Sequence, residues 1–162
     1  MASFGSLFYF SETLVMALQT LNLTSADISA HLATVSTFPV GFALENFAEG
    51  DAVSVAGVNG ADMVKGIDGG AGYWYIPTVK EVQINLMPGS RCCKNLLLLA
   101  QANETARNPD LIQLVITIPA MNLVVTFIDG VMTSYPPMPG IQNRLQNMPF
   151  SFKFREVVCA TL

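Results

Sequence analysis

The stretch Phe150-Ser151-Phe152-Lys153-Phe154-Arg155 alternates strictly between aromatic and polar side chains. Successive side chains of a β-strand point to opposite faces of a sheet, so the three phenylalanines share one face and the serine, lysine and arginine share the other. We therefore predict a half-buried strand whose phenylalanines lie in the core. Such a strand needs neighbouring strands or a helix to cover its aromatic face, and this indicates a mainly β fold.

The same two-residue alternation recurs in three other segments, 81–86, 111–118 and 123–127. From residue 42 onward, turn residues divide the chain into short pieces, and they include Gly50-Asp51, Asn59-Gly60 and Asp68-Gly69-Gly70. Frequent turns between short apolar segments favour an antiparallel sheet with at least one long, glycine-rich loop.

One helix is expected to interrupt the strands. Ser90 follows a Pro-Gly turn and is a favourable N-cap residue. After it, an apolar stripe with helical spacing is formed by Cys93, Leu96, Leu97 and Ala100. We predict a helix that ends near Asn103 and whose Leu96–Leu99 run belongs to the core rather than to an interface.

The N-terminal third has a less regular pattern. Leu14, Leu18 and Leu21 have helical spacing, whereas Leu7–Phe10 suits a strand equally well. Thr24–Asp27 resembles a helix capping box and precedes a helix-compatible run to about Val35. We divide the chain into an N-terminal element, residues 1–37, and a β domain, residues 38–162, which together fit one domain.

The composition indicates a chain that buries part of its surface in an assembly. Hydrophobic residues make up 51% of the chain and charged residues 12%, with a mean hydropathy of +0.44, whereas about 25% charged residues is usual. A membrane-spanning helix needs about 20 consecutive apolar residues, and polar residues interrupt the longest apolar stretch, Leu111–Ile128. The beginning of the chain lacks the positive region of a secretory signal. We therefore expect contacts with other subunits and no membrane insertion.

The charge distribution argues against specific nucleic-acid binding. The first basic residue is Lys65, so the first 64 residues carry a net charge of −6 and the remainder +2, which sums to the formal net charge of −4. A protein that binds nucleic acid needs clustered basic residues to neutralise phosphates. We expect this acidic chain not to bind DNA or RNA specifically.

The residue inventory offers little for catalysis. His31 is the one histidine, so a site with two histidine ligands is impossible, and a Ser-His-Asp or Cys-His arrangement would have to use it. Its neighbours suggest an exposed or capping position, and the carboxylates are scattered along the chain. We predict that the protein is not an enzyme, with no catalytic, cofactor-binding or metal-binding residues and no cofactor.

Three other motifs have structural interpretations. The Gly66–Gly72 segment lacks the Gly-Lys-Ser/Thr ending of a phosphate-binding loop, so we interpret it as a flexible hairpin loop. The cluster Tyr73-Trp74-Tyr75 suits a core or subunit contact better than a ligand platform. Cys92, Cys93 and Cys159 form neither a C-x-x-C pair nor an even set, so we expect reduced thiols.

The order of these motifs resembles that of bacteriophage tail-tube and tube-initiator-like proteins. Over residues 38–158 the chain presents, in order, Ala48-Glu49-Gly50-Asp51, the strand Val79–Leu86, the turn Pro88-Gly89-Ser90, the helix start Asn95–Leu99, and Phe127-Ile128-Asp129-Gly130 before the aromatic last strand. Residues 1–37 have no counterpart in this resemblance.

The resemblance implies a tail-tube-type β-sandwich or half-barrel with one packed helix. It also implies that six copies pair their strands edge to edge into a β-lined ring, and that stacked rings form a channel through which DNA passes without specific binding. The expected partners are copies of the chain and other tail proteins such as sheath, tape measure or baseplate. The expected location is the virion tail, after synthesis and assembly in the host cytoplasm. Loops such as Gly57–Gly72 are candidates for contacts between rings.

Two alternatives stay open at this stage. The unmatched N-terminal element suits a specialised ring at the baseplate or tail end, such as a tube initiator, as well as a repeated tube subunit. A protein of another class, a β-sandwich that binds a small ligand or carbohydrate, would use Tyr73, Trp74 and Tyr75 as a stacking platform.

Overall fold

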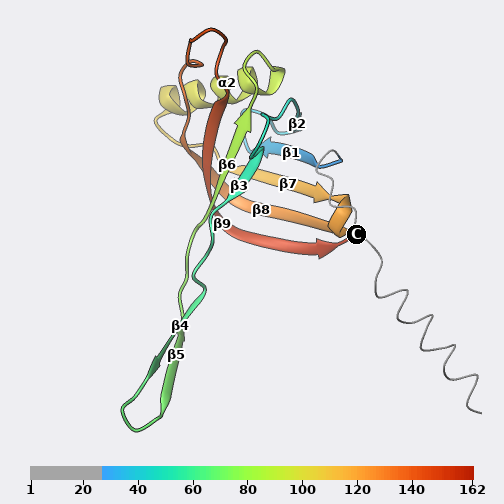
Figure 1. Ribbon diagram of the computed structural model, residues 1–162. Helices are drawn as coiled ribbons and strands as arrows, with labels where there is room; N and C mark the ends of the chain where they lie inside the picture. The colour runs from blue at the N-terminus through green and yellow to red at the C-terminus, as the bar shows by residue number, and fades with distance from the viewer. Residues whose placement is uncertain (1–26) are drawn as a thin grey trace, which may run out of the picture.

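The computed structural model describes residues 27–162 (Figure 1). Its strands are β1 (Ser29–Thr34), β2 (Phe42–Leu44), β3 (Val53–Val55), β4 (Ala61–Lys65), β5 (Ala71–Tyr75), β6 (Lys80–Leu86), β7 (Ile112–Ile118), β8 (Leu123–Ser134) and β9 (Met148–Thr161). The helices are α2 (Arg91–Ala106) and the short 3-10 helix η1 (Pro119–Met121). Seven strands form one antiparallel sheet in the order β2-β1-β7-β8-β9-β6-β3, while β4 and β5 pair only with each other.

The core lies on the phenylalanine face of β9, as predicted. Phe150 and Phe152 are fully buried, opposite Ile84 and Val82 of β6, and the neighbouring Lys153 is exposed. Strand β7 follows the predicted alternation, with Ile112, Leu114 and Ile116 buried. Cross-strand pairs of large apolar side chains are the main unit of sheet stabilisation, so the two-residue pattern alone determined these facings correctly.

Helix α2 begins where the sequence indicated. The Ser90 side chain accepts a hydrogen bond from the Cys93 backbone N–H at 3.3 Å, and Leu96 and Leu99 are buried. The helix runs to Ala106, three residues beyond the predicted end at Asn103, and stops because Arg107 adopts a left-handed conformation. Of the leucine run, Leu98 alone is exposed.

The buried thiols tie the helix to the sheet. Cys92 donates a hydrogen bond to the carbonyl of Ala43 in β2 and accepts one from the backbone N–H of Glu45. Cys93 donates to the carbonyl of Met87. Burial raises the pKa of the Cys93 thiol, although its hydrogen bond with Ser90 opposes this effect, so the reactive thiolate form is disfavoured. Cys159 is exposed, and all three cysteines are free thiols, as predicted.

The sheet curls into a half-barrel because β8 and β9 both bend near the same point (Figure 1). Asp129 has a positive φ of 52° and precedes Gly130, which pairs with Phe154. The Phe154 ring lies directly over Gly130, where a Cβ atom would overlap it. On the outside of the bend, Asp129 and Arg155 form an ion pair at 2.7 Å, which is exposed and therefore contributes little to stability.

The helix-compatible interpretation of the run to Val35 is wrong. Residues Ser29–Thr34 form strand β1, which lies between β2 and β7. Ala30 and Leu32 are buried while His31 is exposed, so the period is two residues rather than 3.6. Alanine favours a helix by propensity, but pairing with β7 over six residues decides for the strand, because tertiary context overrides helix propensity. The alternatives for Leu7–Phe10 and for Leu14, Leu18 and Leu21 lie outside the described residues.

Asp110 joins the turn after β1 to the start of β7. Its carboxylate accepts hydrogen bonds from the backbone N–H groups of Ser36 at 3.2 Å and Thr37 at 3.0 Å. Burial alone acts to raise the pKa of Asp110, but these donors stabilise the charged form, and the net effect lowers the pKa below its ordinary value of 3.8.

This lowered pKa predicts a pH-dependent contribution to stability. The ionised carboxylate stabilises the fold at neutral pH, and the stabilisation is lost as the pH falls through the lowered pKa of the folded state. We expect Asp110→Asn to lower the urea midpoint at pH 7, and the difference from the wild type to shrink at pH 3. The control, Asp51→Asn, removes the same charge without these hydrogen bonds. A difference that stays constant with pH would contradict the prediction.

Candidate functional site: the assembly surfaces

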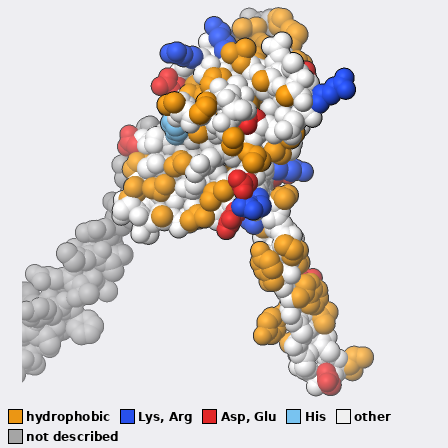
Figure 2. All heavy atoms as spheres, turned by 180° about the vertical axis from the view of Figure 1, so that it is seen from behind, with side chains coloured by type: hydrophobic (Ala, Val, Ile, Leu, Met, Phe, Trp, Pro, Cys, Tyr) orange, Lys and Arg blue, Asp and Glu red, His pale blue; other side chains and the backbone are white. Residues whose placement is uncertain are grey.

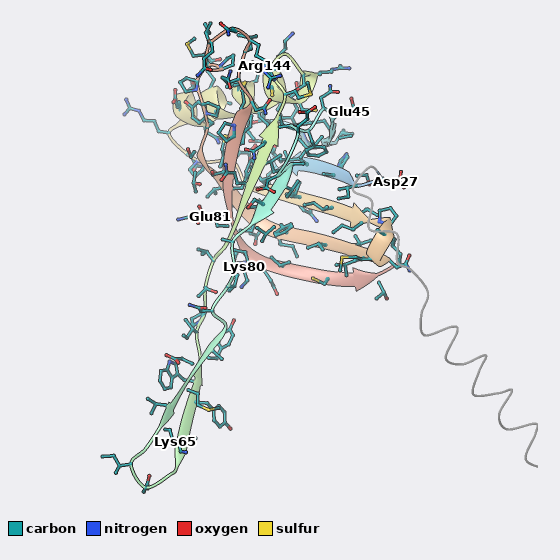
Figure 3. All side chains as sticks on the ribbon, in the orientation of Figure 1. Asp27, Glu45, Lys65, Lys80, Glu81 and Arg144 are labelled. Carbon is teal, nitrogen blue, oxygen red and sulfur yellow. The ribbon has the colours of Figure 1, made fainter. Side chains whose placement is uncertain are left out.

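A long hairpin, here called the arm (residues 56–79), projects from the sheet between β3 and β6 (Figure 1). It contains β4, β5 and the tight turn between them, in which Gly66 and Gly70 are hydrogen-bonded. The hairpin interpretation of Gly66–Gly72 is therefore confirmed, although Gly57–Gly72 is not simply a loop, since it includes a strand. Figure 3 places Lys65 near the tip of the arm and Lys80 at its base.

The arm exposes large apolar side chains along its whole length (Figure 2). Tyr73 is 82% exposed, Tyr75 72% and Trp74 47%, so the aromatic cluster is not part of this chain's core. Met63, Val64 and Ile67 are exposed as well. Exposed apolar surface of this extent marks an interaction site in soluble proteins. Of the two expectations for the cluster, a core position or a subunit contact, only the subunit contact therefore remains.

The aromatic cluster does not form one stacking platform. Tyr73 and Tyr75 lie opposite Met63 and Ala61 on one face of the hairpin, whereas Trp74 lies opposite Asp62 on the other. A sugar or planar ligand could therefore stack on the tyrosines or on the tryptophan, but not on all three at once. Both faces of the arm therefore expose large apolar side chains to water.

The second surface is a strand edge. Strand β6 pairs with β9 only as far as Lys80 and Phe154. Residues Glu156–Thr161 of β9 pair with β8 on one side, and on the other side they have no partner strand within residues 27–162. We call this stretch the free edge of β9. Its unpaired N–H and C=O groups are available to a strand of another chain.

The third surface is the side of the sheet that faces away from the core over β1, β7, β8 and the second half of β9, here called the outer face. Its side chains follow from the strand register and are Ser29, His31, Ala33, Gln113, Val115, Thr117, Val124, Thr126, Ile128, Glu156, Val158 and Ala160. Only His31 and Glu156 among these are titratable, and Arg155, which precedes Glu156 in β9, forms an ion pair with Asp129. The outer face is therefore nearly neutral and offers nothing that would hold a phosphate backbone.

The fourth surface is an open apolar groove of about 900 Å³ on the concave side of the half-barrel. Its walls include Phe47, Val53, Ile118, Val125 and Val157, which are half-buried and pack against the core. Its polar lining comes from Glu49, Asp51 and Lys80. Helix α2 packs on the more deeply buried part of the core, so the groove is the part of the concave side that the helix leaves uncovered.

His31 lies exposed on the outer face, across from Ala43 and Val115 in the neighbouring strands. Within residues 27–162, no three His, Cys, Asp or Glu side chains are grouped so as to bind a metal ion. The helices in this part of the chain are too short or too polar to cross a membrane.

The chain is similar to known proteins both in sequence and in fold. Residues 21–158 match the family described as tail fiber protein gp32. No curated protein matches the chain.

Several solved structures share the fold at 10% sequence identity. A chain of the sheath-tube complex of an extracellular contractile injection system (PVC) in its extended state has a TM-score of 0.59, with 93% of this chain and 98% of that chain covered. A chain of the anti-feeding prophage baseplate has a TM-score of 0.57, with 88% and 98% covered. A chain of the anti-feeding prophage cap, the tube terminating cap, has a TM-score of 0.56, with 89% and 94% covered.

The half-barrel, the packed helix α2 and the projecting arm therefore define a tail-tube-type fold, as the sequence resemblance implied. Because the family match spans most of the described residues, the chain belongs to the tail fiber protein gp32 family. The free edge, the outer face and the groove could not be located from the sequence. Each depends on which strands become neighbours, and that is a property of the tertiary structure.

Proposed function

We propose that this chain is a structural subunit of a phage-type tail that closes into a hexameric ring with a central channel. The free edge of β9 carries this proposal, because an exposed strand edge is satisfied by a strand of another chain. Closed symmetric rings use such head-to-tail contacts without endless growth. The anti-feeding prophage baseplate, whose structure was 6-fold symmetrised, contains a chain with the same fold.

In the proposed ring, the free edge of β9 pairs with β2 of a neighbour, the strand at the other end of the sheet. The four strands β1, β7, β8 and β9 then join those of the next copy, and their outer faces line the channel. The outer face has no cluster of lysine and arginine side chains, and this supports the proposed orientation, since a neutral or acidic wall lets DNA pass without binding it.

The arm is proposed to connect neighbouring subunits or rings. It is apolar on both faces, with Tyr73 and Tyr75 on one and Trp74 on the other, so a single covering surface leaves one face in water. Insertion between two subunits covers both. We propose that this insertion takes place between stacked rings.

The proposed ring belongs to the tail of a phage particle. The protein is expected in the tail of the virion, after assembly in the host cytoplasm, with sheath, tape measure or baseplate proteins as further partners. The similar folds occur in a sheath-tube complex, a baseplate and a tube terminating cap, so both a repeated tube ring and a terminal ring are supported. The split placement of the aromatic residues argues against a carbohydrate-binding function.

Native mass spectrometry and negative-stain microscopy of the purified chain test the proposal together. We expect a species of six times the 17.4 kDa chain mass and rings with a central hole. Stacks of rings formed by the chain alone would indicate a repeated tube subunit, and single rings a terminal one. A strict monomer at high protein concentration would overturn the ring.

Charges placed on the arm are expected to block stacking but not folding. Tyr73→Glu with Tyr75→Glu puts two carboxylates on an apolar face, and burying either one without a partner costs several kcal/mol. We expect the circular dichroism spectrum to be unchanged and contacts between rings to be lost. Gln101→Glu, on the exposed side of α2, is a control that adds negative charge away from the arm.

Trp74 reports directly on this contact, because it is the one tryptophan of the chain. We expect its fluorescence emission to shift to shorter wavelength when wild-type rings stack. In the double glutamate variant the emission should stay at the wavelength of unstacked protein. Normal stacking by that variant would show that the tyrosine face is not an interface.

A further inference from the structure

The apolar groove is open in the part of the chain that the structure describes. Val125 and Val157 in its wall are only half-buried, although they belong to the same strands as the fully buried core residues. A groove of about 900 Å³ with mainly apolar walls loses free energy to exposed hydrophobic surface as long as it stays open to water.

The chain enters the described structure at the rim of this groove. Ile28 lines the groove, and β1 begins at the next residue, Ser29. The described part of the chain therefore begins beside the groove. The N-terminal segment, residues 1–26, is rich in large apolar residues, contains Glu12 as its one charged side chain, and has no lysine or arginine. Such a segment favours an apolar surface over water.

We propose that the N-terminal segment of the same chain docks in the groove and completes the concave side of the half-barrel. Two observations select this occupant over the arm of a second copy. The segment is tethered at the rim, so its local concentration at the groove is high without any assembly. It is also uncharged apart from Glu12, whereas the tip of the arm would bring Lys65 and Asp68 to apolar walls.

Site-specific photo-crosslinking in the full-length chain tests this docking. A benzophenone amino acid replaces Phe8, and the adducts are mapped by mass spectrometry. We expect adducts on groove residues such as Phe47, Ile118 and Val125, in a product that runs as a monomer on a denaturing gel. Adducts on the arm or on the outer face would overturn the proposal. Adducts in the groove of a cross-linked dimer would overturn docking within the same chain and point to exchange between copies.

A matched pair of variants on β9 shows whether the groove itself is recognised. Val157→Glu places a carboxylate in the groove wall, and the yield of groove adducts should fall by at least about tenfold. Val158→Glu changes the next residue, which is exposed on the outer face, and should leave the yield unchanged. Equal yields from both variants would contradict the proposal.

A further variant covers the case in which Val157→Glu does not fold. Leu14→Gln with Leu18→Gln alters only the segment, leaves every groove residue intact, and should reduce the adduct yield in the same way. Microscopy of the same samples scores ring formation separately, so a failure of docking and a failure of the ring remain distinguishable.

Discussion

Phe152→Asp is expected to abolish folding of the chain. Phe152 is completely buried in the middle of β9, opposite Val82 of β6 and Met132 of β8. Removing a buried phenylalanine side chain alone costs about 3–5 kcal/mol. The aspartate adds the cost of an unpaired charge in an apolar core. Together these terms are comparable to the whole stability of a domain, about 5–15 kcal/mol.

The measurement is the soluble yield, followed by urea unfolding of any protein recovered. Lys153→Asp is the matched control, since it introduces the same residue one position further along the same strand, on the exposed face. A surface change of this kind is usually worth less than about 0.5 kcal/mol. Equal yields and midpoints for the two variants would show that the face of β9 has been assigned incorrectly.

Gly130→Ala is expected to have the next largest effect. An alanine Cβ at this position would overlap the ring of Phe154, which is buried and also packs against Phe127 at 5.1 Å between ring centroids. The buried ring must shift against its neighbours, or the bend of β8 and β9 must open. Overpacking of this type costs about 1–3 kcal/mol, which lowers the urea midpoint clearly.

A double variant separates the steric cause from a general effect of losing a glycine. In Gly130→Ala with Phe154→Leu, the smaller side chain makes room for the new methyl group. We expect the combined loss of stability to be less than the sum of the two single losses. Gly57→Ala, where an added Cβ meets nothing within 4 Å, is the control at an open position. Additive losses in the double variant would exclude the steric explanation.

The strands with strict alternation were predictable because each carries its facing in its own residues. Phe150–Arg155 and Ile112–Ile118 lie in β9 and β7 as expected, and Ser90 caps α2 as its side chain allows. These features rest on local chemistry, on the two-residue period of a strand and on one side-chain hydrogen bond. No distant residue is needed to infer them.

Strand β1 was mistaken for part of a helix because its alanines favour a helix by propensity. Ala30 and Ala33 lack the branching that marks a strand, and the pairing partner that decides the matter, β7, lies about 80 residues further along the chain. The aromatic cluster of the arm presented a similar difficulty. Tyr73-Trp74-Tyr75 has the composition of a core strand, and only its pairing with β4, away from the main sheet, leaves it exposed.

The sequence by itself thus determined a β-rich chain with one capped helix, a phenylalanine core and too few charges for an isolated surface. The tertiary structure alone decided where the surfaces available for assembly lie: on the arm, at the free edge of β9, on the outer face and in the groove beside Ile28. The physical reason is that alternation assigns a side chain to one of two faces of its strand. Whether a face or an edge is covered depends on the order of strands in the sheet, which is set by contacts between residues far apart in the chain.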